Sequence, residues 1–414
     1  MISRMEKDLI LDTHEKPKVL NWISLSLQHV LAMFGATVLV PLLTDLPVGL
    51  TLISSGVGTL TYIFITKGKV PIFLGSSFAF ISPIVASMTS AGQGGVTGGL
   101  IMIGLSYIVI ALIIRFAGTG WVHKVLPPVV IGPTIMIIGL YLAPVAIRWS
   151  SEHVIVAFIT LLVAVFISTY TKGLFQLLPI FFGMIAGYIA AVTFGIVDFS
   201  AFQYTISNRV IFNNISFAIF NYTPVFSWEI AALMIPVSIV TIAEHIGDVL
   251  LLNDILKRDL TKEPGLHRTL IGDGVASLMA GLIGGPANTT YGENIGVVGL
   301  TKVASVWVIG GAAITAIVLG FFAPFTSLIS TIPLPVMGGV SILLFGIIAS
   351  CGARVMINGK VDLGLQRNLI IASVILVIGV GDMELSYGNI TIGGMALAAI
   401  IGIVLNLILP NSES

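Results

Sequence analysis

Fourteen mostly apolar stretches divide the chain, each close to the roughly 20 residues that a helix needs to cross a bilayer. They are too long and too evenly apolar for the strands of an outer-membrane barrel, which alternate apolar and polar residues. The pattern therefore predicts membrane-spanning helices. The predicted segments are residues 21–43, 48–66, 70–89, 95–117, 125–147, 154–171, 174–197, 229–252, 269–285, 287–302, 304–324, 331–350, 368–381 and 391–409.

The third and tenth segments are weak as continuous helices, because glycine and hydroxyl-bearing residues interrupt both of them. The stretch 286–302 (PANTTYGENIGVVGLTK) places Asn, Thr, Tyr and Glu side chains at neighbouring positions. Polar backbone survives at membrane depth only where it is buried in protein or lines a cavity, and an acidic residue there marks a functional site. We therefore interpret this stretch, with Glu293, as half of a binding site.

The composition supports an all-α polytopic membrane protein, since 56% of the 414 residues are hydrophobic and 9% are charged, against about 25% charged in soluble proteins. The 19 basic and 19 acidic residues cancel, so we expect no nucleic-acid partner. The single cysteine, Cys351, excludes an internal disulfide. We find no nucleophile with an adjacent base and no long soluble domain, so we do not expect an enzyme.

Basic residues gather on one side of the predicted helices. With fourteen spans and both termini inside, 17 Lys and Arg residues lie on the inner side, and only Arg148 and Arg209 lie outside. Because basic residues concentrate on the cytoplasmic side, we expect a multi-pass protein of the cytoplasmic (inner) membrane with both termini in the cytoplasm. The first 18 residues are mostly polar, so we expect the first span to serve as its own targeting signal.

An internal repeat relates the two halves of the chain. Residues 128–139 (PVVIGPTIMIIG) match residues 335–346 (PVMGGVSILLFG) in the Pro, the Val, two Gly and the hydroxyl of Thr134 or Ser341. These residues belong to the fifth and twelfth segments, which are seven segments apart. Because seven is an odd number of membrane crossings, we expect the two halves to insert with opposite orientation. Inverted repeats with an interrupted helix at matching positions are typical of secondary transporters that bind substrate near the membrane midplane.

Three acidic residues lie deep within apolar segments, whereas we place the other sixteen in loops, tails or at segment ends. Glu244 and Asp248 are four residues apart and share one helical face, and Glu293 is the third. We find no Lys or Arg at that depth. Crowded carboxyl groups in a low dielectric resist ionisation, so at least one is expected to hold a proton in part of a transport cycle. Sodium bound through the same oxygens is the alternative.

Two histidines also fall within apolar segments. His245 follows Glu244 but points about 100° away from it around the helix. A single membrane histidine most often forms a hydrogen bond between helices, which is our main interpretation of both. His29, in the first segment, is retained as a candidate that supports proton coupling.

The third segment offers further binding groups. If residues 75–80 (GSSFAF) are unwound, their amides face a cavity and Phe78 or Phe80 presents a ring. Together with the amide of Gly292 and two carboxylates, these groups fit a small, flat, neutral molecule with ring N–H groups and carbonyls. An inorganic anion fits badly, because anion sites use helix N-termini or basic residues without nearby carboxylates.

At these residues the chain resembles the bacterial uracil permeases of the nucleobase/ascorbate transporter (nucleobase:cation symporter 2) family. The likeness covers nearly every segment, including SLQHVLAMFGATVLVP (26–41), GSSFAFISP (75–83), IAEHIG (242–247) and IPLPVMGGVSILLFG (332–346). The family signature is an acidic residue or Gln, Asn, any residue, Gly, four of any kind, Thr, and a basic residue or Gly. Its residues here are Glu293, Asn294, Gly296, Thr301 and Lys302.

The resemblance implies two seven-span inverted repeats, with short strands that interrupt spans three and ten. Spans one to four and eight to eleven would form a core domain, and the remaining spans a gate domain. The implied parts are a cytoplasmic tail (1–20), the core (21–117 and 229–324), the gate (125–197 and 331–409) and an extracytoplasmic linker (198–228).

The resemblance also implies a uracil:proton symporter that works by alternating access, has no metal or other cofactor, and forms a homodimer through the gate domain. A xanthine or other purine:cation symporter is the alternative, and an anion exchanger on the same architecture is less favoured. The implied substrate-binding residues are Glu244, Glu293, Phe78, Gly292, Tyr291 and Ser341. The implied proton-coupling residues are Glu244, Asp248 and His29.

Two positions depart from the uracil permease pattern. Asp248 stands where a similar uracil permease has His, and Phe345 stands where it has Tyr. Other members of the family, including purine carriers, have an acid at the first of these positions. Glu293, by contrast, resembles the uracil carriers, since many purine carriers have Gln there.

Overall fold

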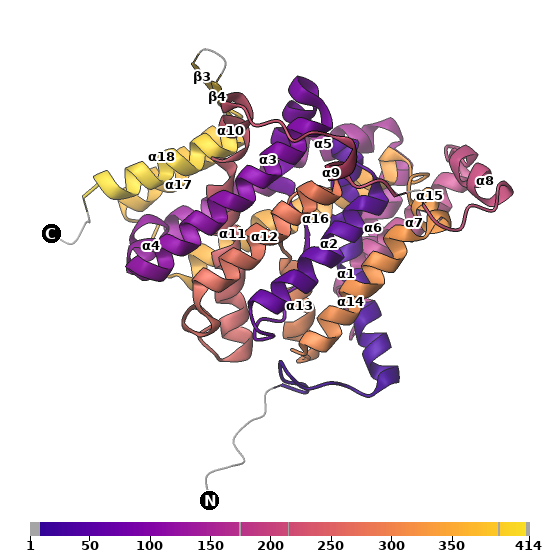
Figure 1. Cartoon of the computed structure of the whole chain (residues 1–414), viewed down its shortest axis with the longest axis horizontal. Coiled ribbons are helices and arrows are strands. Elements are labelled where there is room, and N and C mark those ends of the chain that lie inside the picture. The colour runs from indigo at the N-terminus through magenta and orange to yellow at the C-terminus, as the bar shows by residue number, and fades with distance from the viewer. Residues whose placement is uncertain (1–8, 174, 214, 388–389, 411–414) are drawn as a thin grey trace, which may run out of the picture.

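Long helices packed side by side make up most of the protein, and a computed structural model describes residues 9–173, 175–213, 215–387 and 390–410 (Figure 1). The N-terminal half contains α1 (Val19–Thr44), α2 (Val48–Ile65), β1 (Leu74–Ser76), η1 (Phe78–Phe80), α3 (Ile81–Ala117), α4 (Gly120–Val125), α5 (Pro128–Glu152), α6 (Val154–Tyr170), η2 (Phe175–Leu177), α7 (Pro179–Thr193) and α8 (Ser200–Ser207).

The C-terminal half repeats the arrangement of a three-residue strand followed by a helix. It contains α9 (Ala218–Asn221), α10 (Trp228–Met234), α11 (Val237–Leu256), η3 (Thr261–Gly265), α12 (Leu266–Ile283), β2 (Asn288–Thr290), α13 (Gly292–Thr301), α14 (Val306–Phe321), α15 (Ala323–Ile329), α16 (Leu334–Asn358), α17 (Gln366–Val380), β3 (Leu385–Tyr387), β4 (Ile390–Ile392) and α18 (Gly394–Ile408). Each of the fourteen predicted segments contains at least part of one helix.

Two of the helices break where the sequence interrupts them. α3 runs through both the third and the fourth predicted segments, and its backbone leaves the helical conformation at Gly92, with φ 61° and ψ −160°. The eighth segment divides into α10 and α11 immediately before Val237, at Pro236, because proline cannot donate the hydrogen bond that continues a helix.

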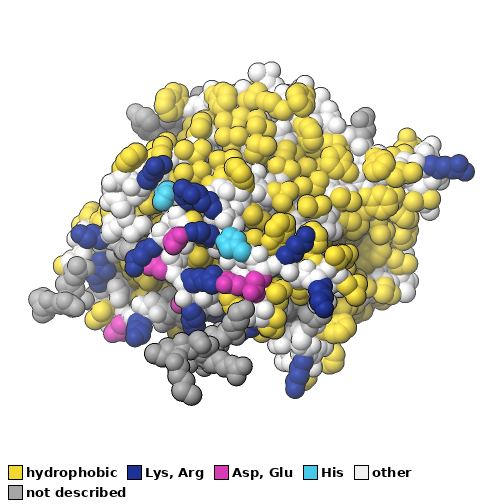
Figure 2. Space-filling view, turned by 60° about the horizontal axis from the view of Figure 1, so that its bottom comes forward, with side chains coloured by type: hydrophobic (Ala, Val, Ile, Leu, Met, Phe, Trp, Pro, Cys, Tyr) yellow, Lys and Arg dark blue, Asp and Glu magenta, His cyan; other side chains and the backbone are white. Residues whose placement is uncertain are grey.

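In the described part of the chain, six helical stretches are long and apolar enough to cross a membrane: Val19–Thr44, Val48–Ile65, Phe78–Ala117, Pro128–Glu152, Trp228–Leu256 and Leu334–Asn358. Shorter apolar helices are α6, α7, α14, α17 and α18. Figure 2 shows broad apolar surface above a face on which basic, acidic and histidine side chains gather. The chain is therefore a multi-pass membrane protein.

Matching helices of the two halves pack against each other. α5 packs along α16, so the two copies of the repeat are neighbours, and α12 packs against both α2 and α3. α5 and α16 meet closely at Gly132 and Gly352, where a Cβ on either glycine would reach 2.8 or 2.4 Å from the carbonyl oxygen of the other. Small residues permit this close approach between membrane helices.

Two strand pairs accompany the helices. β1 and β2 pair antiparallel in the register Leu74 with Thr290, Gly75 with Thr289 and Ser76 with Asn288. The strands implied for the third and tenth segments are therefore present, and helices follow each of them directly. β3 and β4 form a hairpin between α17 and α18. The predicted linker, 198–228, contains α8 and α9, and its residue 214 lies outside the described residues.

Candidate binding site

The crossing of β1 and β2 is held by hydrogen bonds from both halves. The Ser77 amide donates to the Ala287 carbonyl at 2.8 Å, and the Tyr291 amide donates to the Phe73 carbonyl at 3.1 Å, so the ladder extends at both ends. The Thr59 hydroxyl on α2 accepts from the Leu74 amide at 2.9 Å and donates to the Leu74 carbonyl at 3.2 Å. The hydrogen-bonding groups of this non-helical backbone are thus paired among the apolar helices, as their burial requires.

Asn288 connects β2 to the surrounding helices. Its amide nitrogen donates to the carbonyls of Ser54 at 3.0 Å and Ala276 at 3.2 Å. The hydroxyl of Ser277 on α12 donates to the Asn288 carbonyl at 2.7 Å. Part of the unusual polarity of the stretch 286–302 therefore supports the backbone itself.

Tyr291, which follows β2, packs against β1 and is hydrogen-bonded to it. A Cβ on Gly75 would lie 2.3 Å from the Tyr291 ring, so only glycine fits at this position of β1. The Tyr291 hydroxyl donates to the Ser76 carbonyl at 3.0 Å and accepts from the Thr37 hydroxyl at 3.3 Å. Tyr291 borders the cavity described next, but its hydroxyl is occupied by this framework.

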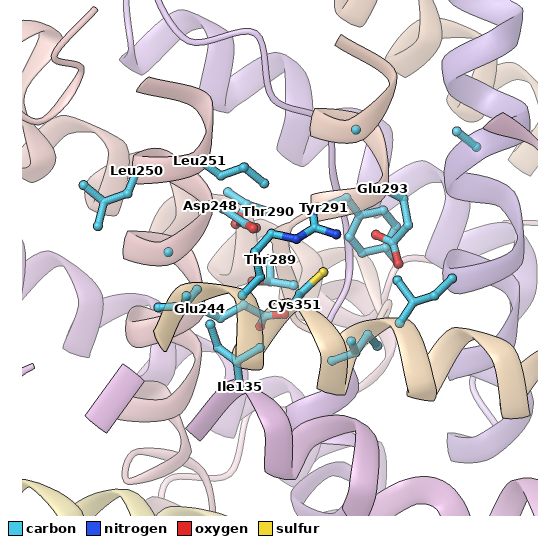
Figure 3. A pocket seen from close by; sticks show the side chains of 18 of the residues that line it. Ile135, Glu244, Asp248, Leu250, Leu251, Thr289, Thr290, Tyr291, Glu293 and Cys351 are labelled. Carbon is cyan, nitrogen blue, oxygen red and sulfur yellow. Dashed lines mark hydrogen bonds between the residues drawn. The ribbon is translucent and has the colours of Figure 1, made fainter. Parts of the chain in front are cut away.

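A cavity of about 680 Å³ opens beside the strand crossing, within the range of roughly 300–1,000 Å³ that small-molecule sites span. α1, α5, α7, α11, α13 and α16 all contribute lining residues. Figure 3 shows the side chains of Glu244, Asp248 and Glu293 around it, together with Thr289 and Thr290 of β2. Six of the predicted site residues line this cavity: Phe78, Glu244, Asp248, Tyr291, Gly292 and Glu293.

Different elements position the three predicted carboxyl groups. Glu244 and Asp248 lie one turn apart on α11, and Glu293 lies in the first turn of α13. All three residues are half-buried and face the cavity. Asp248 Oδ2 accepts a hydrogen bond of 2.6 Å from the hydroxyl of Thr290, the last residue of β2. The structure therefore brings together acids that are 49 residues apart in the chain.

The cavity extends from these acids toward the ends of α11 and α16. Asn253 and Asp254 lie close to the end of α11, and Arg354 and Asn358 close to the end of α16. Among the described lining residues, Arg354 is the only cation. The described residues contain no group of three or more His, Cys, Asp or Glu side chains that could hold a metal ion.

Phe78 meets Phe345 at the inner wall of the cavity. Their ring centroids are 5.6 Å apart and their planes are at 83°, an edge-to-face contact. Phe345 is one of the two departures noted in the sequence, and the structure places it next to a predicted binding residue. Phe345 also lines a second, apolar cavity of about 130 Å³ between α5 and α16.

The structure does not place Ser341 or His29 in the lining of the large cavity. The Ser341 hydroxyl donates to the Met337 carbonyl at 2.6 Å, one turn earlier in α16. His29 is buried, and Asn294 Nδ2 lies 3.1 Å from both its Nδ1 and its carbonyl oxygen. His29 therefore joins α1 to α13, the helix contact that we expected as the main role of such a histidine.

Asp273 is a buried acid that the sequence analysis missed. We placed it at a segment end, which is wrong, since it lies within α12 with no exposed surface. Its Oδ2 is 3.3 Å from Nδ1 of His245, which is also fully buried. The glycines on both sides of Asp273, in a segment of otherwise apolar character, were the available signal. Asp273 does not line the cavity.

An apolar helical protein in which a polar pair of short strands interrupts the helices has the features of a secondary transporter. Comparison with known families agrees. The model of the Xan_ur_permease family, described as a permease family, matches residues 20–387, so this chain belongs to that family. It is a permease and not an enzyme.

Similar curated proteins match over nearly their whole length. The uracil permease of Bacillus caldolyticus is 49% identical over 411 residues, which cover 97% of this chain and 95% of that protein. The uracil permease of Bacillus subtilis (strain 168) is 47% identical over 427 residues, covering 99% and 97%. The uracil permease of Escherichia coli (strain K12) is 44% identical over 406 residues, covering 95% and 92%.

Solved structures with the same fold include more distant transporters. The transmembrane domain of the cyanobacterial bicarbonate transporter BicA matches with a TM-score of 0.62 and 15% identity, covering 95% of this chain and 99% of that one. The murine Solute Carrier 26 family member A9 anion transporter matches with a TM-score of 0.63 and 12% identity, covering 95% and 68%. At these identities the likeness concerns the fold alone.

Proposed function

We propose that this chain imports uracil together with protons across the cytoplasmic membrane by alternating access. The observation that carries the proposal is the cavity beside the strand crossing, where Glu244, Asp248 and Glu293 meet. Similarity to uracil permeases over nearly the whole chain supports the substrate.

In this proposal uracil lies in the cavity against the strand crossing. Glu244 and Glu293 accept its two ring N–H groups, and the backbone amides of Phe78 and Gly292 donate to its carbonyls. The Phe78 ring flanks the base. Four residues that all line one cavity support this set, and carboxylate acceptors favour a neutral ring with N–H donors over an anion.

Tyr291 and Ser341 take positioning roles in the proposed site. The Tyr291 hydroxyl is committed to Ser76 and Thr37, so the residue shapes the cavity wall through its ring. The Ser341 hydroxyl is bonded within α16, and Ser341 would contact substrate only in another state of the cycle.

Proton coupling is assigned to Glu244 and Asp248, with His29 in support. Asp248 is one helical turn from Glu244. The hydrogen bond from the Thr290 hydroxyl connects the Asp248 carboxyl group to β2, which borders the proposed binding site. His29 contacts α13, the helix that carries Glu293, through Asn294. A carboxyl that exchanges a proton as substrate arrives and leaves is what symport requires.

We further propose fourteen spans arranged as two seven-span inverted repeats, with a core domain (21–117 and 229–324), a gate domain (125–197 and 331–409), a homodimer through the gate and both termini in the cytoplasm. The packing of α2 and α3 with α12, and of α5 with α16, supports this division. Since the cavity reaches the ends of α11 and α16, the side assigned to the cytoplasm, this conformation corresponds to an inward-open state.

Uptake of labelled uracil into vesicles containing the purified protein tests the proposal. We expect accumulation driven by an imposed pH gradient at zero sodium. Unlabelled uracil should compete, whereas xanthine, adenine and ascorbate should not. Accumulation that follows sodium and ignores pH would overturn the proton assignment, and stronger competition by xanthine than by uracil would overturn the substrate.

A further inference from the structure

Residues 9–16, which we call the N-terminal strap, run across the charged face of the protein before α1 begins. In Figure 1 the strap lies at the bottom of the view, below α13 and α14, and Figure 2 looks toward this face. Its sequence, LILDTHEK, is not that of a membrane span. Its order therefore has to come from specific contacts.

Backbone hydrogen bonds attach the strap to the connection between α13 and α14. The Ile10 amide donates to the Lys302 carbonyl at 2.7 Å, and the Ala304 amide donates to the Leu11 carbonyl at 2.8 Å. The Val306 amide donates to the Thr13 carbonyl at 2.9 Å. This strand-like alternation runs parallel to the connection and joins the strap to the end of α13, the helix that carries Glu293 in its first turn.

A second set of contacts attaches the strap to the end of α11. Arg258, two residues beyond that helix, donates from Nη2 to Asp12 Oδ2 at 2.6 Å. Leu9 packs against a buried apolar cluster that includes Leu252 of α11 with Ile295 and Val298 of α13. The strap therefore touches both helices that carry the carboxyl groups of the site.

The strap is anchored at its other end by two tryptophans. Lys16 Nζ lies 4.7 Å from the ring centroid of Trp22 and 5.0 Å from that of Trp307, so the ammonium lies within reach of two aromatic faces. The Ser305 hydroxyl donates to the Glu15 carbonyl at 2.6 Å. The segment between these contacts and Leu9 is thus fixed at both ends.

We propose that the N-terminal strap is a positioning element for transport, which clamps the cytoplasmic ends of α11 and α13 so that Glu244, Asp248 and Glu293 keep their mutual spacing while the cavity opens and closes. α11 and α13 are separated in the chain by α12 and β2, and the strap spans both ends from outside. This inference rests on the proposed transport function.

The test is a charge swap across the Asp12–Arg258 pair. Asp12→Arg and Arg258→Asp each place like charges together, and the double variant restores the attraction in reverse. We expect each single variant to slow uracil uptake about two- to fivefold, the range that an exposed ion pair supplies, with uracil affinity unchanged. The double variant should recover most of the rate. Asp12→Asn, which removes one charge without repulsion, provides a milder variant that folds if the reversals do not.

Lys69 and Glu263 form a matched control, because they are an exposed ion pair of which neither member belongs to the strap. Glu263→Gln should leave the uptake rate unchanged. Cys351, the single cysteine, lines the cavity, so its rate of maleimide modification reports the open cavity without any substrate. We expect the single reversals to change this rate about two- to fivefold as well.

Three results would overturn the strap proposal. The first is that the single variants match the unmodified protein in uptake and in Cys351 modification, and the second is that the double variant is as slow as the single variants. The third is a loss of uracil affinity equal to the loss of rate, which would indicate a structural role only. Failure of the proposed function is distinguishable. In that case the unmodified protein takes up no uracil, while the Cys351 measurement still separates the variants.

Discussion

The hydroxyl of Thr290 donates a 2.6 Å hydrogen bond to Oδ2 of Asp248 and thereby connects β2 to α11. The net contribution of a hydrogen bond of this kind is about 0.5–1.5 kcal/mol. We expect Thr290→Val, which keeps the shape and removes the donor, to lower the uracil uptake rate about tenfold, since tenfold corresponds to about 1.4 kcal/mol. Thr89→Val is the control, because the Thr89 hydroxyl donates within its own helix, to the Val85 carbonyl at 2.9 Å, and Thr89 does not line the cavity. Equal effects of the two substitutions would contradict a specific role for the bond.

Removal of either proposed acceptor should abolish binding. Glu244→Gln keeps the size of the side chain but replaces a carboxylate oxygen with a donor that faces the uracil N–H, and Glu293→Ala removes the acceptor altogether. Both side chains are half-buried at the cavity, so we expect the variants to fold. Calorimetric titration with uracil should show no binding while size-exclusion profiles stay unchanged, and wild-type-like binding in either variant would refute the assigned site.

Gly75 should tolerate no side chain. Its Cβ would lie 2.3 Å from the Tyr291 ring, and such overpacking costs about 1–3 kcal/mol. We expect Gly75→Ala to lower the thermal unfolding temperature in detergent and to weaken uracil binding, because the strand crossing shifts. Gly346→Ala on α16 is the matched control, since a Cβ there meets no atom within 4 Å. A stability of Gly75→Ala equal to that of the control would argue against the tight crossing.

His245 and Asp273 should depend on each other. They are 3.3 Å apart and neither side chain has exposed surface. Removal of one partner leaves the other polar group buried without its neighbour, which costs about 1–3 kcal/mol or more, whereas replacement of both costs less. We expect His245→Leu to destabilise the protein strongly and the double variant His245→Leu with Asp273→Asn to recover much of the loss in thermal unfolding. Additive losses would show that the two side chains are independent.

The strap should loosen at low pH. The hydrogen bond from Arg258 lowers the pKa of Asp12 below its ordinary value, so the ionised form is favoured in the folded protein. The stability from this pair is then fully present above about pH 4 and is lost as the pH falls through the lowered pKa of Asp12. Both side chains are partly exposed, so the contribution is at most about 1 kcal/mol.

Hydrogen exchange measures this loosening at the Ile10 and Ala304 amides. After correction for intrinsic exchange rates, their protection should fall as the pH drops below about 4, the ordinary pKa of Asp, and on through the lowered pKa of Asp12. Asp12→Asn should lower the protection at pH 6 and remove the pH dependence. Protection that falls equally in both proteins would assign the loosening to another group.

The sequence predicted the elements whose chemistry conflicts with their surroundings. Glu244, Glu293 and the two interrupted segments were recognisable because polar residues stood inside apolar runs. Asp273 was missed because it lies near the start of its apolar segment, where an acid is ordinary, while the helix in fact begins earlier, at Leu266. The role of Tyr291 in holding Gly75 was not predictable, since it depends on two residues that only the fold brings together.

The strap shows a different limit. Most of its hydrogen bonds to the rest of the protein join backbone groups, and its ion pair, Asp12 with Arg258, joins residues 246 positions apart. Backbone groups are the same at every position, so no residue pattern distinguishes a polar tail that docks from one that stays in solvent. The resemblance to a known family suggested the proposed binding residues, but the docking of this tail is visible only in the folded structure.

The pairing of β1 with β2 also has a consequence for the order in which the chain is synthesised. Gly75 pairs with Thr289, and the ribosome adds the 214 residues between them (289 minus 75) at about 5–20 residues per second, so β1 waits about 10–40 s for its partner strand. During that interval the Phe73 carbonyl and the Ser77 amide would lie in an apolar environment without their partners, Tyr291 and Ala287. The Thr59 hydroxyl, which bonds both the amide and the carbonyl of Leu74, belongs to the part of the chain already made. Leu74 therefore has its hydrogen-bond partner from the start, and only the alternate backbone groups beside it depend on the second half of the chain.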